Sequence, residues 1–280
     1  MTVDDIASVL ELTGMTGPLV SGFSIDSRQV QPGQLFVAIK GPNFDGHDFI
    51  LEAVAKGAIA VLCEHAVPNL AVPQGVVQDT VKALSQLATA HRKRLSSLRV
   101  IALTGSNGKT TVKEMIASLL PQPSFSTLGN LNNHLGVPLN VLKLTENHRS
   151  AVFELGANQA GDVAYTVAMV QPHVTLINNI APAHIGGFGS IDGVARAKGE
   201  IHAGLLPGGT AVINADDAYA HAWDALLQDK QCLRFSVKTP EFIHARDIHL
   251  DDALGASFTL VTPEGEARVQ LQVPGLHNVS

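Results

Sequence analysis

The sequence has only two cysteines, Cys63 and Cys232, among its 280 residues. Two cysteines cannot build the disulfide framework of a small secreted domain, and they are typical of a reducing compartment. The N-terminal residues are acidic and lack the charged and apolar regions of a secretory signal. No apolar run approaches the roughly 18 residues that a transmembrane helix requires. We therefore expect a soluble cytoplasmic protein without membrane contact.

The chain is also poor in charge. Charged residues make up 16% of the sequence, and 25 acidic against 19 basic side chains give a formal net charge of −6. This balance excludes a generally basic nucleic-acid-binding protein, although it leaves room for a local basic site. The sequence has no low-complexity tract and no repeat of about 20–50 residues. An apolar content of 45% argues against disorder, and at about 100–200 residues per domain a chain of 280 residues is expected to form one or two domains.

The first eighty residues predict a small α/β unit. Short apolar runs favour strands at 35–39, 58–62 and 75–77, and helical patterns span 3–12 and 49–56. A longer helix is predicted over 80–95, where the basic run 91–94 complements the helix dipole. We expect this helix to connect the first unit to a second domain.

From Arg99 onward, apolar strands alternate with helical patterns. The strands are predicted at 100–103, 151–153, 174–177 and 210–213, and the helices after Lys109 and at 162–169 and 192–205. Continuous apolar strands separated by helices indicate a buried, mostly parallel sheet with helices on both faces. Such sheets bind ligands at the carboxyl ends of their strands, which is where we look for chemistry.

The first of these strands leads into a candidate phosphate-binding loop. Its glycines allow the backbone to curl around an anion, and the following helix presents its N-terminus. Lys109 can reach phosphates and the Thr110 hydroxyl can bind Mg²⁺. Leu103 stands where the common motif has glycine, so this is a shorter variant; the alternative is a tight turn that merely uses glycines. The candidate residues are Gly105, Ser106, Asn107, Gly108, Lys109, Thr110 and Thr111.

Two residues after later strands are candidate metal ligands. Glu154 follows the apolar strand 151–153, and a carboxylate there, beside a phosphate loop, is typical of a Mg²⁺ ligand. The alternative is a solvated carboxylate at a strand end. His184 stands in a Gly-rich loop after the strand 174–177, where a ligand role and an ordinary polar surface position are both open.

Spacing alone leaves Lys198 and a group of asparagines ambiguous. Lys198 lies in the predicted helix 192–205, where spacing favours a surface lysine. His202, four residues on, shares its face but identifies no site. The run Asn130-Leu131-Asn132-Asn133 fits an ordinary turn, and also a site for a polar, carboxylate-bearing substrate.

Taken together, several segments resemble the Mur ligase family. Residues 104–114 are similar to the family's ATP loop, and motifs within 26–49 are similar to its UDP-binding domain. Further similar motifs lie at 130–133 with 136–138, 154–158, 178–179 followed by His184, 187–190 with 197–200, and 275–278. The resemblance covers essentially the whole chain. It is strongest to the members that join D-alanyl-D-alanine to UDP-N-acetylmuramoyl-tripeptide.

The resemblance implies an α/β protein of three domains. Residues 1–80 would be a small UDP-muramoyl-peptide-binding domain. Residues 81–280 would be a central ATP-binding domain with a mostly parallel sheet, incomplete at its C-terminal end. The family's third, Rossmann-like domain, which closes over ATP and contacts the incoming amine, would be absent from this sequence. We therefore expect little or no ligase turnover from residues 1–280 alone.

The resemblance also implies roles for individual residues. ATP and two Mg²⁺ ions would be the cofactors, and Lys109, His184 and Lys198 the catalytic residues. Lys198 would be carbamylated by CO₂, which replaces the surface-lysine interpretation. The metal ligands would be Thr110, Glu154, His184 and Lys198. Besides the loop residues, His277 and Asn278 would bind ATP near its adenine. The muramoyl-peptide substrate would contact Ser27, Arg28, Asn43, Phe44, Asn132 and Asn133.

The implied reaction forms an amide through an acyl phosphate in cytoplasmic peptidoglycan precursor synthesis, by a monomer. The site would mostly position and stabilise charge, and we find no Gly-x-Ser-x-Gly motif or cysteine-based nucleophile that competes. The alternatives are a Mur ligase that adds a diamino acid and a phosphate-loop NTPase or substrate-binding fragment without ligase activity.

Overall fold

The computed structural model describes residues 1–183, 185–250, 255–271 and 279. By packing, the chain divides into two compact units. The first contains residues 1–98, 127–149 and 168–170, and the second contains 99–126, 150–167 and the described part of 171–280. A functional boundary at residue 80 stays a prediction, because packing groups the following helix with the first unit.

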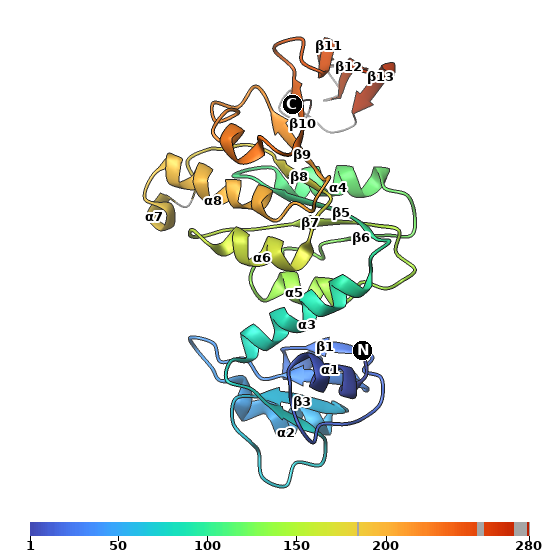
Figure 1. The fold of residues 1–280 in the computed structure, drawn as a ribbon, viewed down its shortest axis with the longest axis vertical. Helices are drawn as coiled ribbons and strands as arrows, with labels where there is room; N and C mark the ends of the chain where they lie inside the picture. Colours follow the sequence, from blue (N-terminus) through green and yellow to red (C-terminus); the bar gives the residue numbers. More distant parts are fainter. Residues whose placement is uncertain (184, 251–254, 272–278, 280) are drawn as a thin grey trace. The chain divides into compact units, whose positions relative to one another are not determined.

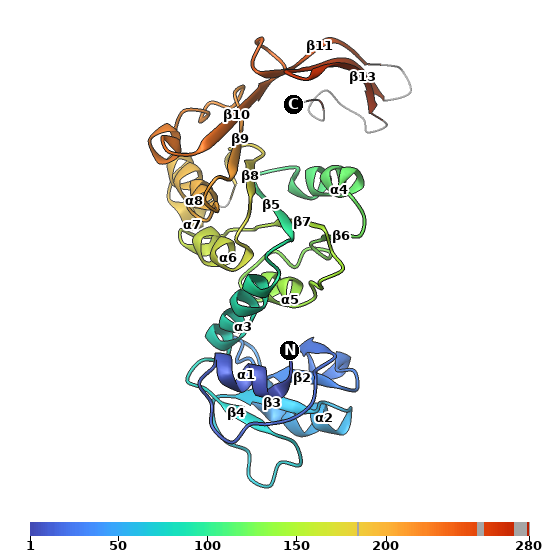
Figure 2. The same cartoon turned by 45° about the vertical axis from the view of Figure 1, so that its right-hand side comes forward.

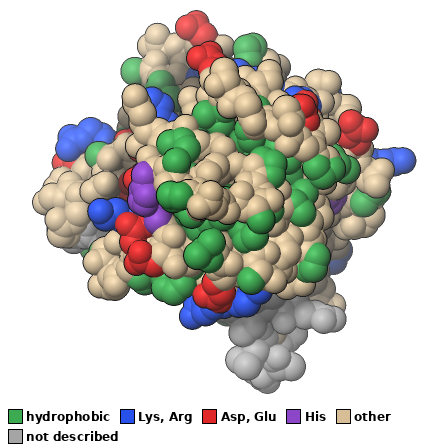
Figure 3. Space-filling model, turned by 90° about the horizontal axis from the view of Figure 1, so that it is seen from below, with side chains coloured by type: hydrophobic (Ala, Val, Ile, Leu, Met, Phe, Trp, Pro, Cys, Tyr) green, Lys and Arg blue, Asp and Glu red, His purple; other side chains and the backbone are tan. Residues whose placement is uncertain are grey.

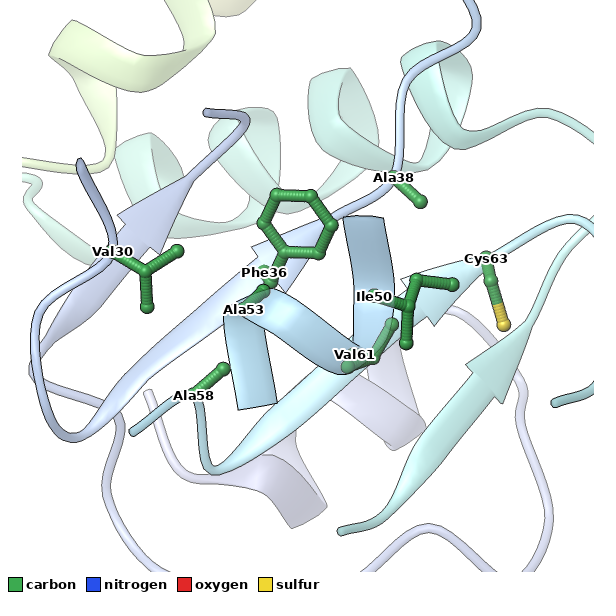
Figure 4. Close-up of a cluster of buried hydrophobic side chains, with 8 residues drawn as sticks. All are labelled: Val30, Phe36, Ala38, Ile50, Ala53, Ala58, Val61 and Cys63. Atoms are coloured by element: carbon green, nitrogen blue, oxygen red, sulfur yellow. The ribbon is translucent and has the colours of Figure 1, made fainter. Parts of the chain in front are cut away.

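The first unit is built on a four-stranded sheet in the order β1-β2-β3-β4, with all neighbours parallel. Helix α2 covers this sheet, and Figure 4 shows the apolar cluster between them, which includes Phe36 of β2 and Ala53 of α2. Two short 3₁₀ helices, Ser27–Gln29 and Gly46–Phe49, and further α-helices complete the unit (Figure 1). The elements are α1 (Val3–Val9), β1 (Gly22–Ser24), β2 (Gln34–Val37), α2 (Ile50–Ala55), β3 (Ala60–Cys63), β4 (Gln74–Val76), α3 (Thr80–Arg94) and α5 (Gly136–Val141).

Helix α1 illustrates how local chemistry sets an element's ends. Thr2 accepts a hydrogen bond from the Asp5 amide, and the Asp5 carboxylate accepts one from the Thr2 amide, which is a capping box. The prediction that the helix continues to Leu12 is wrong, because the helix ends at Val9 and Glu11 adopts a left-handed φ of 56°.

The second unit contains a nine-stranded sheet in the order β13-β12-β11-β10-β9-β8-β5-β7-β6. Neighbours are parallel from β6 to β11, whereas β11, β12 and β13 pair antiparallel. The predicted α/β class with a mostly parallel sheet is confirmed. The strands are β5 (Arg99–Thr104), β6 (Ser124–Ser126), β7 (Ser150–Glu154), β8 (Val174–Ile177), β9 (Thr210–Asn214), β10 (Gln231–Ser236), β11 (Ile243–Leu250), β12 (Ala256–Thr262) and β13 (Gly265–Leu271).

Helices lie on both faces of this sheet, as predicted. Figure 2 shows α4 on one side of the central strands and α6 and α8 on the other. After β5 the chain runs to β6 on one side of the sheet, and after β7 it crosses in the opposite direction to β8. Because such crossovers are right-handed, the two directions place their helices on opposite faces. Strand β5 is therefore the point where the strand order reverses, a usual place for a ligand. The helices are α4 (Lys109–Leu119), α6 (Asp162–Val170), α7 (Ile185–Phe188) and α8 (Ile191–Ala203).

The surface carries apolar side chains among polar ones. In the space-filling view of Figure 3, hydrophobic side chains gather in the middle of the face and charged side chains lie toward its edge. Exposed large apolar residues of the first unit include Leu19, Phe44 and Leu51. Within the described residues, no helix combines the length and the apolar character needed to cross a membrane.

Helix α8 packs on β8 through a buried histidine. His202 is fully buried, and its Nδ1 lies 2.8 Å from the hydroxyl of Thr175 on β8. Its ring meets that of Trp223 edge-on, with centroids 5.8 Å apart. Burial lowers the pKa of His202 from 6.5 to about 4. The folded protein therefore holds this imidazole neutral at a pH where an exposed histidine is protonated.

We expect His202 to make the fold sensitive to acid. Its folded-state pKa is depressed, so stability is lost as pH falls from the unfolded value of 6.5 toward 4. The full shift corresponds to about 3 kcal/mol of unfolding free energy. Urea unfolding at several pH values should give a drop of that order between pH 7 and 4 that is missing in His202→Gln. Parallel pH curves for the two proteins would contradict the assignment.

Candidate functional site

The segment between β5 and α4 folds into the predicted loop. Gly108 caps α4 with a left-handed φ of 71° and no side-chain cap, a conformation that favours glycine. The Lys109 ammonium folds back and donates to the carbonyls of Gly105 at 2.9 Å and Ser106 at 3.3 Å. Burial lowers the pKa of Lys109, against the opposing charge of Glu154. The loop thus curls around a cation at the sheet's carboxyl edge.

Two asparagines directly after β8 hold this loop from the neighbouring strand. The backbone carbonyl of Asn107 accepts hydrogen bonds from the side-chain amides of Asn178 at 2.7 Å and Asn179 at 3.1 Å. The Asn107 N–H donates to the Asn179 side-chain oxygen at 2.9 Å. The Ser106 hydroxyl donates to the carbonyl of Ala181 and accepts from its N–H. The ends of β5 and β8 therefore shape the loop together.

This close approach explains the glycine at 105. A Cβ atom built on Gly105 would lie 2.8 Å from the Cβ of Asn178, closer than side chains tolerate. A Cβ on Gly108 would lie 3.0 Å from the Asn178 amide nitrogen. The two glycines thus serve packing against Asn178 as well as loop curvature.

Strand β7 brings a carboxylate to the same edge. Glu154, the last residue of β7, is only 2% exposed and accepts a hydrogen bond from the Thr110 hydroxyl at 2.9 Å. Next to it, the buried Thr104 hydroxyl donates to the carbonyl of Leu155 at 2.7 Å. The solvated strand-end alternative for Glu154 is therefore wrong. A carboxylate and a hydroxyl side by side are oxygen donors of the kind that Mg²⁺ prefers.

Lys198 is buried rather than a surface lysine. Its side chain lies on α8 with 3% exposure, so the expectation from spacing alone is wrong. Burial lowers its pKa to about 8, and the positive charge of Lys109 acts in the same direction. An amine with such a pKa is partly neutral near physiological pH, which suits covalent chemistry at nitrogen.

Sequence reasoning missed the residues that brace this edge. Asp217, shortly after β9, accepts a hydrogen bond from the Ile180 N–H at 2.8 Å and so holds the segment after β8. Glu200 of α8 accepts from the amides of Gly161 at 2.8 Å and Ala164 at 3.0 Å, at the start of α6. The signal that could have found Asp217 is the segment 214–217, which carries one asparagine and two aspartates at the end of an apolar strand.

The predicted substrate residues belong to the first unit. Asn133 uses its side-chain oxygen to accept from the amides of Leu135 and Gly136, at 3.1 and 2.8 Å, so it caps its own turn. Asn132 is half-buried. The fully buried Asn140, which the sequence did not single out, holds this turn through the carbonyls of Leu131 and Gly136.

The remaining candidates of the first unit lie on two surface turns. Ser27 is buried, whereas the Arg28 guanidinium is exposed and pairs with Asp26 at 2.8 Å. Asn43 is exposed and Phe44 is 65% exposed, on a tight turn closed by a hydrogen bond from the Gly41 N–H to the Phe44 carbonyl. An exposed aromatic ring and an exposed guanidinium suit a planar, anionic ligand.

Three predicted site residues, His184, His277 and Asn278, lie outside the described residues. Over the described part of the chain, no group of three or more histidine, cysteine or acidic side chains gathers in the manner of a metal site. Glu154 with Thr110 would therefore hold a metal only in combination with other donors. Mg²⁺ fits this arrangement, because it commonly keeps waters and substrate phosphate oxygens among its ligands.

Comparison with known proteins gives two family matches. The Mur ligase middle domain matches residues 103–280, and the Mur ligase family catalytic domain matches residues 19–93. A curated relative, the UDP-N-acetylmuramoyl-tripeptide–D-alanyl-D-alanine ligase of Haemophilus influenzae, is 43% identical over 98% of this chain and 61% of its own length. The chain thus spans about three fifths of this relative.

Solved structures agree with this match. The crystal structure of MurF from Acinetobacter baumannii superposes with a TM-score of 0.92 at 38% identity, covering 99% of this chain and 62% of that one. MurF ligase from Thermotoga maritima, solved in complex with ADP, has a TM-score of 0.76 at 29% identity, covering 89% and 57% of the two chains.

The hydrogen bond from the Thr104 hydroxyl to the Leu155 carbonyl should stabilise the fold more than a threonine hydroxyl that bonds within its own helix does. In Thr104→Val the carbonyl of Leu155 loses its buried donor, at a cost of about 1–3 kcal/mol. Thr166→Val is the matched control, since the equally buried Thr166 hydroxyl donates to carbonyls of its own helix. Urea unfolding should rank Thr104→Val as clearly less stable. Equal losses in the two variants would contradict this role.

Proposed function

The chain belongs to the Mur ligase family, and from this premise we propose that it is the substrate- and ATP-binding part of a ligase. The proposed enzyme adds D-alanyl-D-alanine to UDP-N-acetylmuramoyl-tripeptide. The observation that carries the proposal is the gathering of the phosphate loop, Glu154 and Lys198 at the carboxyl edge of one sheet. Relatives named for this reaction support the choice of substrates.

The reaction requires activation because a carboxylate does not react with an amine. A carboxylate oxygen is a poor leaving group and has to be activated. The terminal carboxylate of the tripeptide therefore attacks the γ-phosphorus of ATP, and ADP departs. The amine of D-alanyl-D-alanine then attacks the acyl phosphate carbon. The tetrahedral intermediate collapses to the amide and inorganic phosphate, with loss of a proton from nitrogen.

The protein's main task in this scheme is to bring two anions together. Lys109 supplies a fixed positive charge at the loop, and the backbone amides at the start of α4 add dipoles of the same sense. Thr110 and Glu154 would hold Mg²⁺, and His184 would bind a second ion. Bound Mg²⁺ would neutralise phosphate charge. The Mg²⁺ ions and the role of His184 are part of this proposal.

Lys198 has the properties that carbamylation needs. Reaction with CO₂ forms a carbon–nitrogen bond to the neutral amine and releases a proton, and it converts the side chain into a carboxylate. A buried ammonium next to Lys109 is unfavourable, whereas a carbamate there would be attracted to that charge. We propose that this carbamate completes the Mg²⁺ site.

The remaining assignments follow the resemblance. Arg28 and Phe44, with Ser27 and Asn43, would bind the UDP end, and Asn132 and Asn133 the muramoyl-peptide. His277 and Asn278 would lie near adenine. We place the enzyme in the cytoplasm as a monomer, where ATP and UDP-linked precursors are found. Relatives 43% identical to the chain favour this substrate over a diamino acid.

Lys109→Ala tests the nucleotide site. Removing the Lys109 ammonium, which donates to the loop carbonyls, should weaken binding of a non-hydrolysable ATP analogue with Mg²⁺ by tenfold or more in isothermal titration. Binding of UDP-N-acetylmuramoyl-tripeptide should stay nearly unchanged, and ATP hydrolysis by the full-length enzyme should disappear. Lys143→Ala, at an exposed position, is the control. Loss of both ligands in Lys109→Ala would indicate a structural role instead.

Lys198 should carry a carbamate. With ¹³CO₂ at fixed pressure, the protein should show a carbamate carbon signal in its NMR spectrum that Lys198→Ala lacks. Because the neutral amine is required and the pKa is about 8, the signal should fall steeply from pH 8 to pH 6. A signal that persists in Lys198→Ala, or none in the parent protein, would refute the carbamate.

A further inference from the structure

We propose that Trp223 is a positioning residue for Lys198, acting through a notch in α8 at Gly199. The inference rests on the proposed role of Lys198 in the ligase. It concerns a residue that the reaction scheme does not use, on the segment between β9 and β10. Trp223 is 6% exposed and is the only tryptophan of the chain.

The contact between Trp223 and α8 leaves room only for glycine. A Cβ atom built on Gly199 would lie 2.4 Å from the indole Nε1 of Trp223 and 2.5 Å from its Cδ1. Glycine in a helix interior costs about 1 kcal/mol relative to alanine, so its presence here calls for a reason. The indole edge occupies the space that a side chain at 199 would fill.

A hydrogen bond fixes the indole in this notch. The Trp223 N–H donates to the carbonyl of Ala195 at 3.1 Å, and this contact is buried. In a helix the carbonyl of residue 195 points toward residue 199, so both contacts lie on the same strip of α8. Lys198 directly precedes Gly199. When α8 can neither rotate about its axis nor slide at this strip, the Lys198 side chain keeps one direction.

A second anchor ties α8 to the sheet. His202, whose ring meets that of Trp223, faces Thr175 of β8 with 2.8 Å between Nδ1 and the hydroxyl oxygen. Strand β8 continues into Asn178 and Asn179, which hold the phosphate loop. A continuous set of contacts therefore connects Trp223, α8, β8 and the loop.

The segment around Trp223 is held to β10 as well as to α8, where the Tyr219 hydroxyl donates to Asp192. The Arg234 guanidinium of β10 donates to the carbonyl of Ala220 at 3.0 Å and forms an ion pair with Asp224. These contacts hold the chain on both sides of Trp223. The indole can thus resist movement of α8 rather than follow it.

Lys198 needs such a restraint. Its ammonium is buried and lies within the field of a like charge, Lys109. The loss of hydration and the repulsion from Lys109 both favour a rotation of α8 about its axis that would release the Lys198 side chain into water. The Trp223 contact opposes that rotation, and so keeps the amine at the sheet's edge before and during its conversion.

Gly199→Ala is the central test, because the added methyl group should expel the indole. The single tryptophan makes its fluorescence specific for this contact, and we expect a red shift of the emission. At pH 8 under ¹³CO₂ we expect the carbamate signal at Lys198 to fall at least fivefold in protein that circular dichroism shows to be folded. Trp223→Phe, which keeps a ring but loses the N–H donor, should lower the carbamate in the same direction.

A matched variant separates positioning from general loss of stability. Val167→Ala loosens the packing at the C-terminal end of α8, where Val167 lies against Gly204, and it removes no atom of the notch at Gly199. It should lower the melting temperature yet keep the carbamate within twofold at temperatures where both variants are folded. A carbamate loss in Val167→Ala equal to that in Gly199→Ala, or none in Gly199→Ala despite a displaced indole, would overturn the inference.

A readout without CO₂ distinguishes this inference from the proposed function. In a Cys232→Ser background, Lys198→Cys places a thiol at position 198. Its reaction with a thiol reagent should be slow and should accelerate tenfold or more when Gly199→Ala is added. If the parent protein forms no carbamate but this acceleration occurs, the role of Lys198 fails and the positioning by Trp223 stands. An unchanged thiol rate would overturn the positioning whatever the carbamate result.

Discussion

The carboxamides of Asn178 and Asn179 hold the backbone of Asn107, and the geometry of the candidate phosphate-binding loop depends on these hydrogen bonds. A glycine-rich loop has many conformations open to it and pays entropy to adopt one. Here the restraint comes from the end of β8, a strand that is distant in sequence and adjacent in the sheet. The same contact requires glycine at 105, so the loop's composition and its partner strand explain each other.

A second constraint is electrostatic. Two lysines, Lys109 and Lys198, share the buried edge of a sheet, and the carboxylate of Glu154 also lies there. Burial of like charges is costly unless counter-charges arrive or one group changes its charge. In the proposed enzyme, ATP supplies the counter-charge and carbamylation reverses the charge of Lys198. In that proposal, the charge balance of the site depends on ATP and CO₂ as well as on the protein's own side chains.

Much of the fold followed from pattern alone. The apolar strands at 100–103, 151–153, 174–177 and 210–213 predicted the parallel core, because strands buried on both faces read as continuous apolar runs. Strands β1, β6 and β10 to β13 were not predicted. The residues of β13 are largely exposed and polar, so hydrophobicity carries no signal, and only antiparallel pairing with β12 makes it a strand.

The sequence by itself determined the glycine-rich loop after β5, the helix that follows it and the candidate metal ligand Glu154, because these depend on residues that are neighbours along the chain or at a strand end. Only the tertiary structure decided that Lys198 is buried, that Gly199 receives Trp223 and that Asn133 caps its own turn. Helical spacing places a side chain on a face, and it cannot tell which face the rest of the protein covers. That choice depends on packing among segments far apart in sequence, such as the strand that carries Thr175 and the turn that carries Trp223.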